Sequence, residues 1–315
     1  MIRDLCKFVM TGCLLRSMIY ASLICVTVSS AQQVLQVRWP TTHGSPPLPL
    51  ADISPEWRPL LRAGVASFSE ETVIATALTQ ADALGLRQDE ATKLQTLFRE
   101  YYRRVRQSKL FAEFPSALPY CLAERKPSEG LASVYVPATV SKQTKSIIFL
   151  HGFGGSVLAY LHYFSTVFSN HMIICPAYGI SPADIPPAYV LEAFKATESR
   201  LKTKLNSPLI AGLSAGGFGA CRVYTQTPSS FRGLICLAAF APNDVGTKWN
   251  SQMTVRFLVG SKESYVADGS FRQQMLSLNP RVNKLDWKLI DQADHFFLLS
   301  HERETKDVLR VWEQP

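Results

Sequence analysis

The clearest pattern in the chain begins after Pro115, where short, continuous apolar runs alternate with stretches of helical periodicity. The apolar runs predict strands at residues 118–123, 132–136, 146–150, 172–175, 209–213, 234–240, 255–259 and 285–290. The periodic stretches predict helices at residues 189–205, 216–225, 271–276 and 297–312. Continuous apolar strands that alternate with helices indicate an α/β fold, with a mostly parallel sheet of about eight strands and helices on both faces. The first two strands have no helix between them, so we expect them to form an antiparallel hairpin at one edge.

A helical hairpin is predicted ahead of this region, at residues 69–117, behind a proline-rich extended arm at residues 32–68. Ser69 is a typical N-cap residue, an acidic first turn follows it, and Gly85 ends the helix. A second helix is predicted over residues 88–107, where apolar and aromatic side chains recur at helical spacing.

Residues 1–31 have the layout of a secretory signal peptide. Basic residues precede an apolar run at residues 18–28, and small residues occupy the positions expected before a cleavage site between Ala31 and Gln32. The alternative, a membrane anchor, needs about 20 apolar residues, whereas Arg16 interrupts this run on its N-terminal side. We therefore expect a secreted or periplasmic protein with no stable membrane anchor after cleavage.

The basic excess of the chain does not by itself indicate a nucleic-acid partner. The 33 Lys and Arg against 25 Asp and Glu give a formal net charge of +8, which becomes +6 if the signal peptide removes three basic residues and one acidic one. The most basic cluster comprises Arg99, Arg103, Arg104 and Arg106, at the end of the second predicted helix, where the helix macrodipole favours cations. Because no helix-turn-helix, zinc-finger or RNA-binding signature accompanies it, we expect no nucleic-acid partner.

The cysteines indicate neither a metal site nor a redox motif. After signal cleavage Cys121, Cys175, Cys221 and Cys236 would remain, in a compartment where disulfides are permitted. Their spacings match no zinc or redox pattern, and two of them lie in apolar runs typical of buried thiols. We expect no cofactor and no metal, and the sequence leaves the disulfide state and the oligomeric state open.

The predicted strand at residues 209–213 runs directly into the pattern Gly-x-Ser-x-Gly, formed by Gly212, Ser214 and Gly216, and a predicted helix follows. A nucleophile on a tight strand-to-helix turn has a strained backbone and no room for neighbouring side chains, which explains a glycine on either side. The pattern alone is common, but its position between a strand and a helix indicates that Ser214 is a nucleophile.

A glycine-rich loop, His151-Gly152-Phe153-Gly154-Gly155, follows the predicted strand at residues 146–150. Acyl transfer passes through a tetrahedral oxyanion, which needs two preorganised backbone N–H donors. We expect one donor to be Phe153 in this loop and the other to be Ala215, at the start of the helix after the nucleophile, where the helix dipole assists. A phosphate-binding loop is the alternative, but the glycine spacing and the lack of a Lys-Ser/Thr ending argue against it.

A general base and an acid follow the serine in the chain order that such a site requires. His295 comes after the last predicted strand, and an imidazole can take up and return a proton near neutral pH. Glu263 follows the strand at residues 255–259 and is the preferred acid to orient the imidazole. Asp268 and Asp244, each after a predicted strand, are the alternative acids.

Together these motifs resemble the α/β-hydrolase superfamily over roughly residues 118–314. Within it the chain is similar to secreted serine esterases of the feruloyl-esterase and polyhydroxybutyrate-depolymerase type and, more distantly, to the catalytic domain of prolyl oligopeptidases. The resemblance implies an α/β-hydrolase catalytic domain at residues 118–315. Those relatives usually carry Asp where Glu263 stands, although Glu serves in some hydrolases.

Many lipases insert a helical cap between the strands that correspond to residues 234–240 and 255–259, and the connection here is too short for one. A lid over the site must then come from the helical hairpin or from the proline-containing loop at residues 177–187. Neither segment can be preferred from the sequence.

These features predict an exported serine hydrolase that cleaves a carboxylic ester, in a small-molecule or polymeric substrate, through an acyl-enzyme on Ser214. A serine peptidase or amidase with the same catalytic residues is the alternative, although residues 32–117 are too few for the propeller of a prolyl oligopeptidase. A non-catalytic homologue that binds a ligand or partner through the helical hairpin is a third possibility. The intact serine, histidine and oxyanion glycines argue against it.

Overall fold

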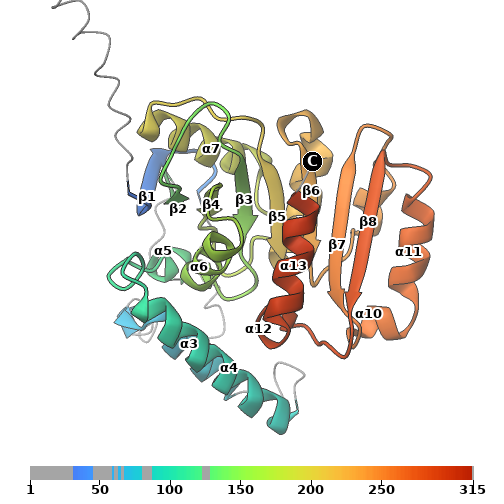
Figure 1. Ribbon diagram of the computed structural model, residues 1–315, viewed down its shortest axis with the longest axis horizontal. Helices are drawn as coiled ribbons and strands as arrows, with labels where there is room; N and C mark the ends of the chain where they lie inside the picture. Colours follow the sequence, from blue (N-terminus) through green and yellow to red (C-terminus); the bar gives the residue numbers. More distant parts are fainter. Residues whose placement is uncertain are drawn as a thin grey trace, which may run out of the picture. The chain divides into compact units, whose positions relative to one another are not determined.

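In the computed structural model the described residues are 31–44, 59, 63–64, 67–79, 87–122 and 128–313, and their strands form an eight-stranded sheet flanked by helices (Figure 1). The strands are β1 (Gln33–Pro40), β2 (Glu129–Val136), β3 (Ser146–Leu150), β4 (Met172–Pro176), β5 (Leu209–Leu213), β6 (Gly233–Leu237), β7 (Thr254–Gly260) and β8 (Lys284–Ile290). The α-helices are α3 (Glu70–Leu78), α4 (Gln88–Gln107), α5 (Leu118–Leu122), α6 (Val157–Val167), α7 (Pro187–Leu201), α8 (Ala215–Gln226), α9 (Asn243–Gly246), α10 (Ser264–Ala267), α11 (Ser270–Leu278), α12 (Phe297–Ser300) and α13 (Glu302–Glu313). The predicted signal peptide, apart from Ala31, lies outside the described residues.

The sheet has the strand order β1-β2-β4-β3-β5-β6-β7-β8. Strand β2 runs antiparallel to both of its neighbours, and the strands from β4 through β8 pair in parallel. This order, with one antiparallel strand next to an edge, is that of the α/β-hydrolase fold, and it confirms the predicted fold class. Because the parallel strands point the same way, the loops after β3, β5, β7 and β8 meet at one edge of the sheet.

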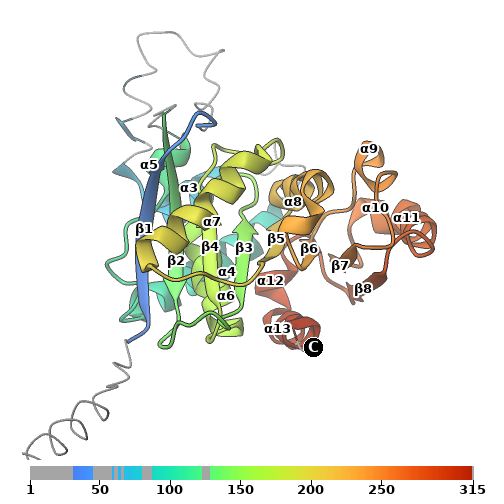
Figure 2. The same cartoon turned by 90° about the horizontal axis from the view of Figure 1, so that it is seen from above.

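The central strands are buried on both faces. Every residue of β3, β4, β5 and β6 is buried, which explains why these strands are continuous apolar runs in the sequence. Alternate side chains enter two separate cores: Ile147 and Phe149 pack on the side of α6 and α13, whereas Ile148 and Leu150 pack on the side of α7, α8 and α11. Figure 2 shows the two helical layers on either side of the sheet.

The edge of the sheet differs from the prediction. The strand predicted at residues 118–123 is wrong over its described residues: Leu118–Leu122 form the short helix α5, with a proline in its first turn, where a missing N–H is tolerated. The antiparallel partner of β2 is instead β1, from the predicted proline-rich arm. Trp39 is buried opposite Gly130, where a Cβ would lie 2.1 Å from the indole, so the tryptophan ring occupies the space that this glycine leaves.

The sequence also missed one helix and merged two others. No helix is predicted between residues 150 and 172, yet α6 lies in this interval, and most of its side chains are buried. A helix that is apolar on nearly all sides has no amphipathic period, so its sequence resembles a buried strand. The single helix predicted at residues 297–312 is two helices, α12 and α13, which break at His301.

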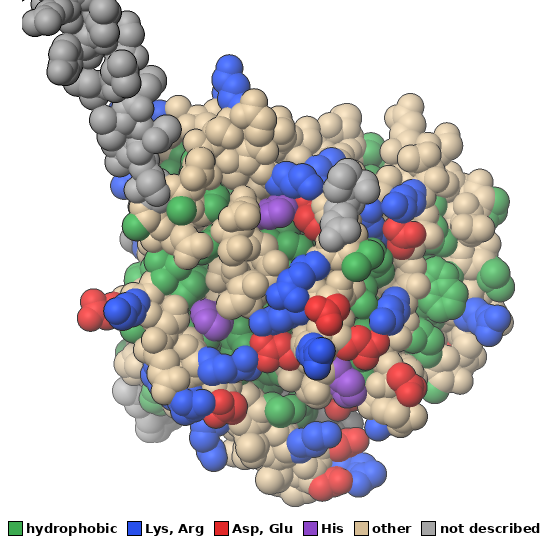
Figure 3. Space-filling model, in the orientation of Figure 1, with side chains coloured by type: hydrophobic (Ala, Val, Ile, Leu, Met, Phe, Trp, Pro, Cys, Tyr) green, Lys and Arg blue, Asp and Glu red, His purple; other side chains and the backbone are tan. Residues whose placement is uncertain are grey.

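Helices α3 and α4 pack against each other, and α4 also contacts α6 and α12. The arginines near the end of α4 form ion pairs: Arg103 with Glu100, Arg104 with Glu302 and Arg106 with Glu71. On the face drawn in Figure 3, acidic side chains lie among the basic ones. No helix in the described part of the chain is long and apolar enough to cross a membrane.

The four cysteines outside the predicted signal peptide are buried, free thiols. The closest approach is between the sulfur atoms of Cys221 on α8 and Cys236 on β6, which lie 3.9 Å apart. Within the described residues, no group of three or more His, Cys, Asp or Glu side chains is arranged to hold a metal ion.

Candidate active site

Ser214 occupies the sharp turn between β5 and α8. Its backbone has φ 55° and ψ −120°, a conformation that a residue with a side chain adopts only under strain. Backbone hydrogen bonds hold it there: its N–H donates to the Leu237 carbonyl at 2.8 Å, and its own carbonyl accepts from Gly217 N–H at 2.8 Å. The turn therefore presents the Ser214 side chain at the carboxyl edge of the sheet.

The two glycines of the Gly-x-Ser-x-Gly pattern are required by close backbone contacts. A Cβ on Gly212 would lie 2.0 Å from the Gly216 carbonyl oxygen, and a Cβ on Gly216 would lie 2.2 Å from the Leu150 carbonyl oxygen. The turn thus lies against the end of β3, and a side chain at either position would clash with backbone atoms and distort the turn that carries Ser214.

His295 and Glu263 come from the loops after β8 and β7, and the structure brings their side chains together. The His295 Nδ1 lies 2.8 Å from Glu263 Oε1. Backbone hydrogen bonds join the two loops, with Ser261 N–H donating to the Ile290 carbonyl and Lys262 N–H to the Ala293 carbonyl, both at 2.9 Å. With its Nδ1 proton directed at the carboxylate, the imidazole has Nε2 left as a hydrogen-bond acceptor.

The two alternative acids lie elsewhere. The Asp268 side chain is exposed and accepts a hydrogen bond from Ser270 N–H at 2.8 Å, which lowers the pKa of its carboxyl group. Asp244 is exposed in the first turn of α9. Of the three candidate acids, Glu263 is the one whose carboxylate contacts His295.

The glycine-rich loop after β3 is fixed by a hydrogen bond with His151, whose side chain is fully buried. Its Nδ1 lies 2.7 Å from the Gly152 carbonyl oxygen, and its Nε2 accepts from Tyr178 N–H at 3.4 Å. Burial lowers the pKa of His151 to about 4, so the ring is neutral at neutral pH and Nδ1 carries the proton that the carbonyl accepts.

The hydrogen bond between His151 and the Gly152 carbonyl also sets the direction of the Phe153 N–H. Because a trans peptide is planar, the Phe153 N–H points opposite to the Gly152 carbonyl, away from His151. The loop also lies directly against the nucleophile, since a Cβ on Gly152 would lie 3.7 Å from the Ser214 Cβ. Ala215, the second predicted donor, is the first residue of α8, so its N–H has no partner within the helix.

Ser214 and His295 line one cavity of about 410 Å³ at this edge. The remaining lining is mainly apolar, and it consists of Val73, Ile74, Leu78, Phe98, Gly152, Phe153, Gly154, Ser156, Tyr160, Ile180, Leu213, Phe296, Leu298 and Leu299. Both segments considered as a lid contribute to it, the helical hairpin through four residues and the loop at residues 177–187 through Ile180.

Sequence reasoning missed the side chains that α3 and α4 contribute to this cavity. Val73, Ile74 and Leu78 lie on one face of α3, and Phe98 lies on α4. Their apolar spacing is visible in the sequence, but it indicates only that this face is covered. What it covers depends on where the two helices dock, and no local signal specifies that.

No protein-family model matches the sequence, and no curated protein matches it either.

Among solved structures, the chain is similar to S-formylglutathione hydrolase from Staphylococcus aureus, with 15% identity, a TM-score of 0.46, and 59% of this chain and 90% of that chain covered. It is also similar to an esterase from Pyrobaculum calidifontis, with 12% identity, a TM-score of 0.48, and 59% and 80% covered. For a poly(3-hydroxybutyrate) depolymerase from Bordetella parapertussis the identity is 10%, the TM-score 0.44, and the coverage 59% and 85%. By its strand order and pairing, the chain has the α/β-hydrolase fold.

Proposed function

We propose that this protein is a serine hydrolase that cleaves carboxylic esters, with Ser214 as the nucleophile. The observation that carries the proposal is the shared cavity: a serine on a strained strand-to-helix turn lines the same space as a histidine whose Nδ1 contacts a carboxylate at 2.8 Å. In an ester hydrolase these three groups have distinct roles, which their positions support.

In the proposed acylation step, Ser214 Oγ attacks the ester carbonyl carbon while His295 Nε2 takes up the hydroxyl proton. Glu263 holds the imidazole in the tautomer that leaves Nε2 free to accept, and it stabilises the imidazolium that forms. The C–O bond to the alcohol then breaks, and His295 returns the proton to the departing alkoxide oxygen. Water attacks the acyl-enzyme in the same manner and releases the acid.

The negative charge that develops on the carbonyl oxygen would be stabilised by the N–H groups of Phe153 and Ala215. His151 fixes the peptide that carries the first of these, and the start of α8 carries the second. Because both donors are backbone groups held by neighbouring hydrogen bonds, little reorganisation is needed when the charge appears.

The lining of the cavity favours an ester over a peptide substrate. Its described lining residues include no Lys, Arg, Asp or Glu, and the polar side chains among them are Ser156, Tyr160, Ser214 and His295. A peptide substrate needs hydrogen-bond partners for its backbone as well as for the scissile carbonyl. An ester with apolar groups makes no such demand.

A fluorophosphonate probe tests the proposal, because it phosphonylates only activated serine nucleophiles. The wild-type protein should be labelled and should hydrolyse p-nitrophenyl acetate. Ser214→Ala should lose both properties but still show a cooperative thermal unfolding transition, which shows that it is folded. An unlabelled wild type without esterase activity would contradict a serine hydrolase. Faster cleavage of an anilide than of the matched aryl ester would instead indicate an amidase or peptidase.

We also propose export, on the sequence of residues 1–31 alone. The same probe can be applied to the cytoplasmic, periplasmic and medium fractions of an expressing bacterium, followed by sequencing of the labelled protein's N-terminus. Labelled protein outside the cytoplasm that begins at Gln32 is the expected result. Full-length protein in the cytoplasm would contradict it.

A further inference from the structure

One wall of the cavity is formed by helices α3 and α4, which precede the first parallel strand by many residues. Val73, Ile74 and Leu78 of α3 and Phe98 of α4 contribute its apolar surface, in the same cavity that Ser214 lines. Burying an apolar substrate group against such side chains is favourable, whereas a charged group would lose its hydration without finding a partner. The wall is therefore suited to an uncharged, apolar part of the ester.

A buried carboxylate, Glu70, connects this wall to the rest of the protein. Glu70 is the first residue of α3 and is only 2% exposed. Its Oε1 accepts hydrogen bonds from Leu158 N–H at 3.0 Å and from the Ser116 hydroxyl at 2.7 Å. Its Oε2 accepts from the Tyr102 hydroxyl at 3.1 Å and lies 3.4 Å from Ala159 N. Donors from three other segments thus converge on one carboxyl group.

The contacts with Leu158 and Ala159 place Glu70 at the N-terminus of α6. The N-cap residue of that helix, Ser156, makes no side-chain capping hydrogen bond, so Glu70 satisfies these N–H groups from another helix. Burial raises the pKa of the Glu70 carboxyl group, and the hydrogen bonds that it accepts lower the pKa in part. Helix α6 begins directly after the loop that carries Phe153, so the carboxylate ties α3 to the end of that loop.

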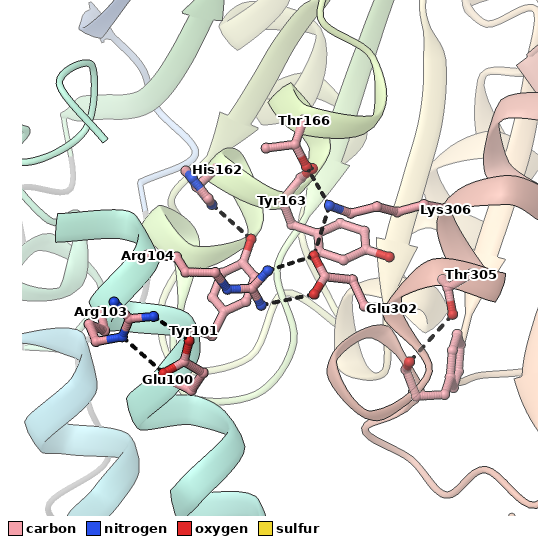
Figure 4. Close-up of polar contacts among 11 residues, drawn as sticks. Glu100, Tyr101, Arg103, Arg104, His162, Tyr163, Thr166, Glu302, Thr305 and Lys306 are labelled. Atoms are coloured by element: carbon pink, nitrogen blue, oxygen red, sulfur yellow. Dashed lines mark hydrogen bonds and ion pairs between the residues drawn. The ribbon is translucent and has the colours of Figure 1, made fainter. Parts of the chain in front are cut away.

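Helix α4 is fixed by a second set of contacts, shown in Figure 4. The Tyr101 hydroxyl lies 2.9 Å from His162 Nδ1 on α6, and the Arg104 guanidinium makes two hydrogen bonds, of 2.8 and 3.1 Å, to the Glu302 carboxylate at the start of α13. Lys306 approaches the same carboxylate to 2.7 Å. Both helices of the wall are therefore attached to elements that border the cavity.

We propose that Glu70 is a positioning residue, which holds the apolar wall of α3 and α4 in the cavity that contains Ser214, so that the enzyme selects esters with an uncharged, apolar acyl or alcohol group. This inference rests on the proposed esterase function. Glu70 does not line the cavity; it acts through the helix that carries Val73 and Ile74, which lie three and four residues after it on the same face.

Two substrate series separate the acyl side from the alcohol side. In the first, p-nitrophenyl acetate, butyrate and hexanoate vary the acyl chain; in the second, ethyl, butyl and hexyl acetate vary the alcohol, with acid release followed by titration. In the series that varies the group packed against the wall, acyl or alcohol, kcat/KM of the wild type should rise with chain length, by up to about fourfold for each methylene buried. A matched monoester with a terminal carboxylate should be a poorer substrate than its uncharged analogue.

The variants Glu70→Gln and Glu70→Ala test the positioning role, and Glu71→Gln is the matched control because Glu71 is the next residue on α3 and pairs with Arg106 at the surface. Glu70→Ala leaves several buried donors without an acceptor, whereas Glu70→Gln keeps one oxygen and the volume. We expect the ratio of kcat/KM for the longest ester of a series to kcat/KM for the shortest to fall about tenfold in Glu70→Ala, which corresponds to the loss of one or two buried methylenes. The ratio should fall less in Glu70→Gln. The change should appear mainly in KM, and Glu71→Gln should match the wild type.

The outcomes distinguish this inference from the proposed function. If the wild type hydrolyses all esters but shows no dependence on chain length, or if Glu70→Ala keeps the wild-type dependence, the inference is overturned while the esterase function stands. A wild type that neither hydrolyses esters nor reacts with the fluorophosphonate overturns both. If Glu70→Ala does not fold, Tyr102→Phe removes one donor from the carboxylate and decides the question: a smaller change in the same direction supports the inference, and an unchanged profile overturns it.

Discussion

Ser214, Glu263 and His295 each follow a parallel strand within five residues of its end, and backbone hydrogen bonds in the adjoining turns place them. The cavity wall formed by α3 and α4 depends on contacts between residues that are far apart in the sequence. Glu70 contacts Leu158, 88 residues further along the chain, and Arg104 contacts Glu302, 198 residues further along. The candidate reaction centre is therefore a product of local turns at the ends of parallel strands, whereas the wall depends on side-chain contacts between distant elements.

From this difference we predict that chemistry and selectivity can be changed separately in this molecule. Substitutions at strand ends should alter the rate for every ester alike, because the scissile bond is common to all substrates. Substitutions in the contacts that hold α3 and α4 should alter the ranking of esters. A variant that changes both the overall rate and the ranking of esters would contradict this separation.

The largest effect is expected at Glu263. In Glu263→Gln the amide can donate a hydrogen bond to His295 Nδ1, which favours the tautomer with the proton on Nε2, where it cannot accept the serine proton. We expect kcat to fall by about 10³- to 10⁴-fold for short and long esters alike. Steady-state kinetics with p-nitrophenyl acetate and hexanoate measure both the loss and its uniformity.

The alternative acids provide matched controls for that variant. Asp268→Asn and Asp244→Asn each remove one carboxylate from a loop near the same edge, and both residues are exposed and do not contact His295. Both should keep activity within about twofold of the wild type, in line with the small effects of most surface substitutions. A large loss in either of them, with Glu263→Gln fully active, would reassign the acid.

A smaller effect, on stability, is expected from His151. Its pKa is about 4 in the folded protein, against about 6.5 for an unperturbed histidine, so between these values the unfolded chain binds a proton that the folded protein does not. The contribution of His151 to the free energy of unfolding is complete above about pH 6.5 and is lost as the pH falls to about 4, a change on the order of 3 kcal/mol. Urea unfolding at pH 7 and pH 4.5 measures it.

The variant His151→Gln removes this titration and should reduce the pH dependence by the His151 contribution. His162 is a suitable comparison, since burial also lowers its pKa to about 4, and His162→Gln should leave the His151 contribution in place. The wild type and His151→Gln losing equal stability between the two pH values would show that His151 is not a buried neutral histidine. At pH 7, His151→Gln should slow ester hydrolysis by removing the ring that fixes the Gly152 carbonyl.

The candidate site could be predicted from the sequence because its signals are local. Continuous apolar runs mark strands buried on both faces, and Gly212 and Gly216 mark a turn whose backbone leaves no room for a side chain. A parallel sheet brings its carboxyl ends together, so residues after separate strands can be expected to meet without knowledge of the packing. The sequence favours Glu263 and leaves Asp268 and Asp244 as alternatives, and the structure adds the contact between Glu263 and His295.

Other elements gave no usable local signal. Helix α6 is buried on most sides and lacks an amphipathic period, and β1 lies in a proline-rich segment whose pairing with β2 is specified by the fit of Trp39 over Gly130. The acidic first turn of α3 is accounted for by the helix dipole, so the sequence gives no reason to single out Glu70 as a buried contact. These features depend on which surfaces meet in the folded protein.

The smallest effect, and the sharpest test of the comparison, concerns two arginines on α4. Arg104 pairs with Glu302 on α13, whereas Arg103 pairs with Glu100 within the same helix, and both are partly exposed. Either pair contributes at most about 1 kcal/mol to stability, so Arg104→Gln and Arg103→Gln should unfold at similar temperatures. Only Arg104→Gln releases a tether between α4 and the helix that follows His295 and α12, so only this variant should lower kcat/KM for the hexanoate relative to the acetate, by about twofold to fivefold. Equal ester profiles in the two variants would mean that the Arg104–Glu302 contact in Figure 4 does not contribute to selectivity, and that other contacts of α4, such as the packing of Phe98, suffice to hold it.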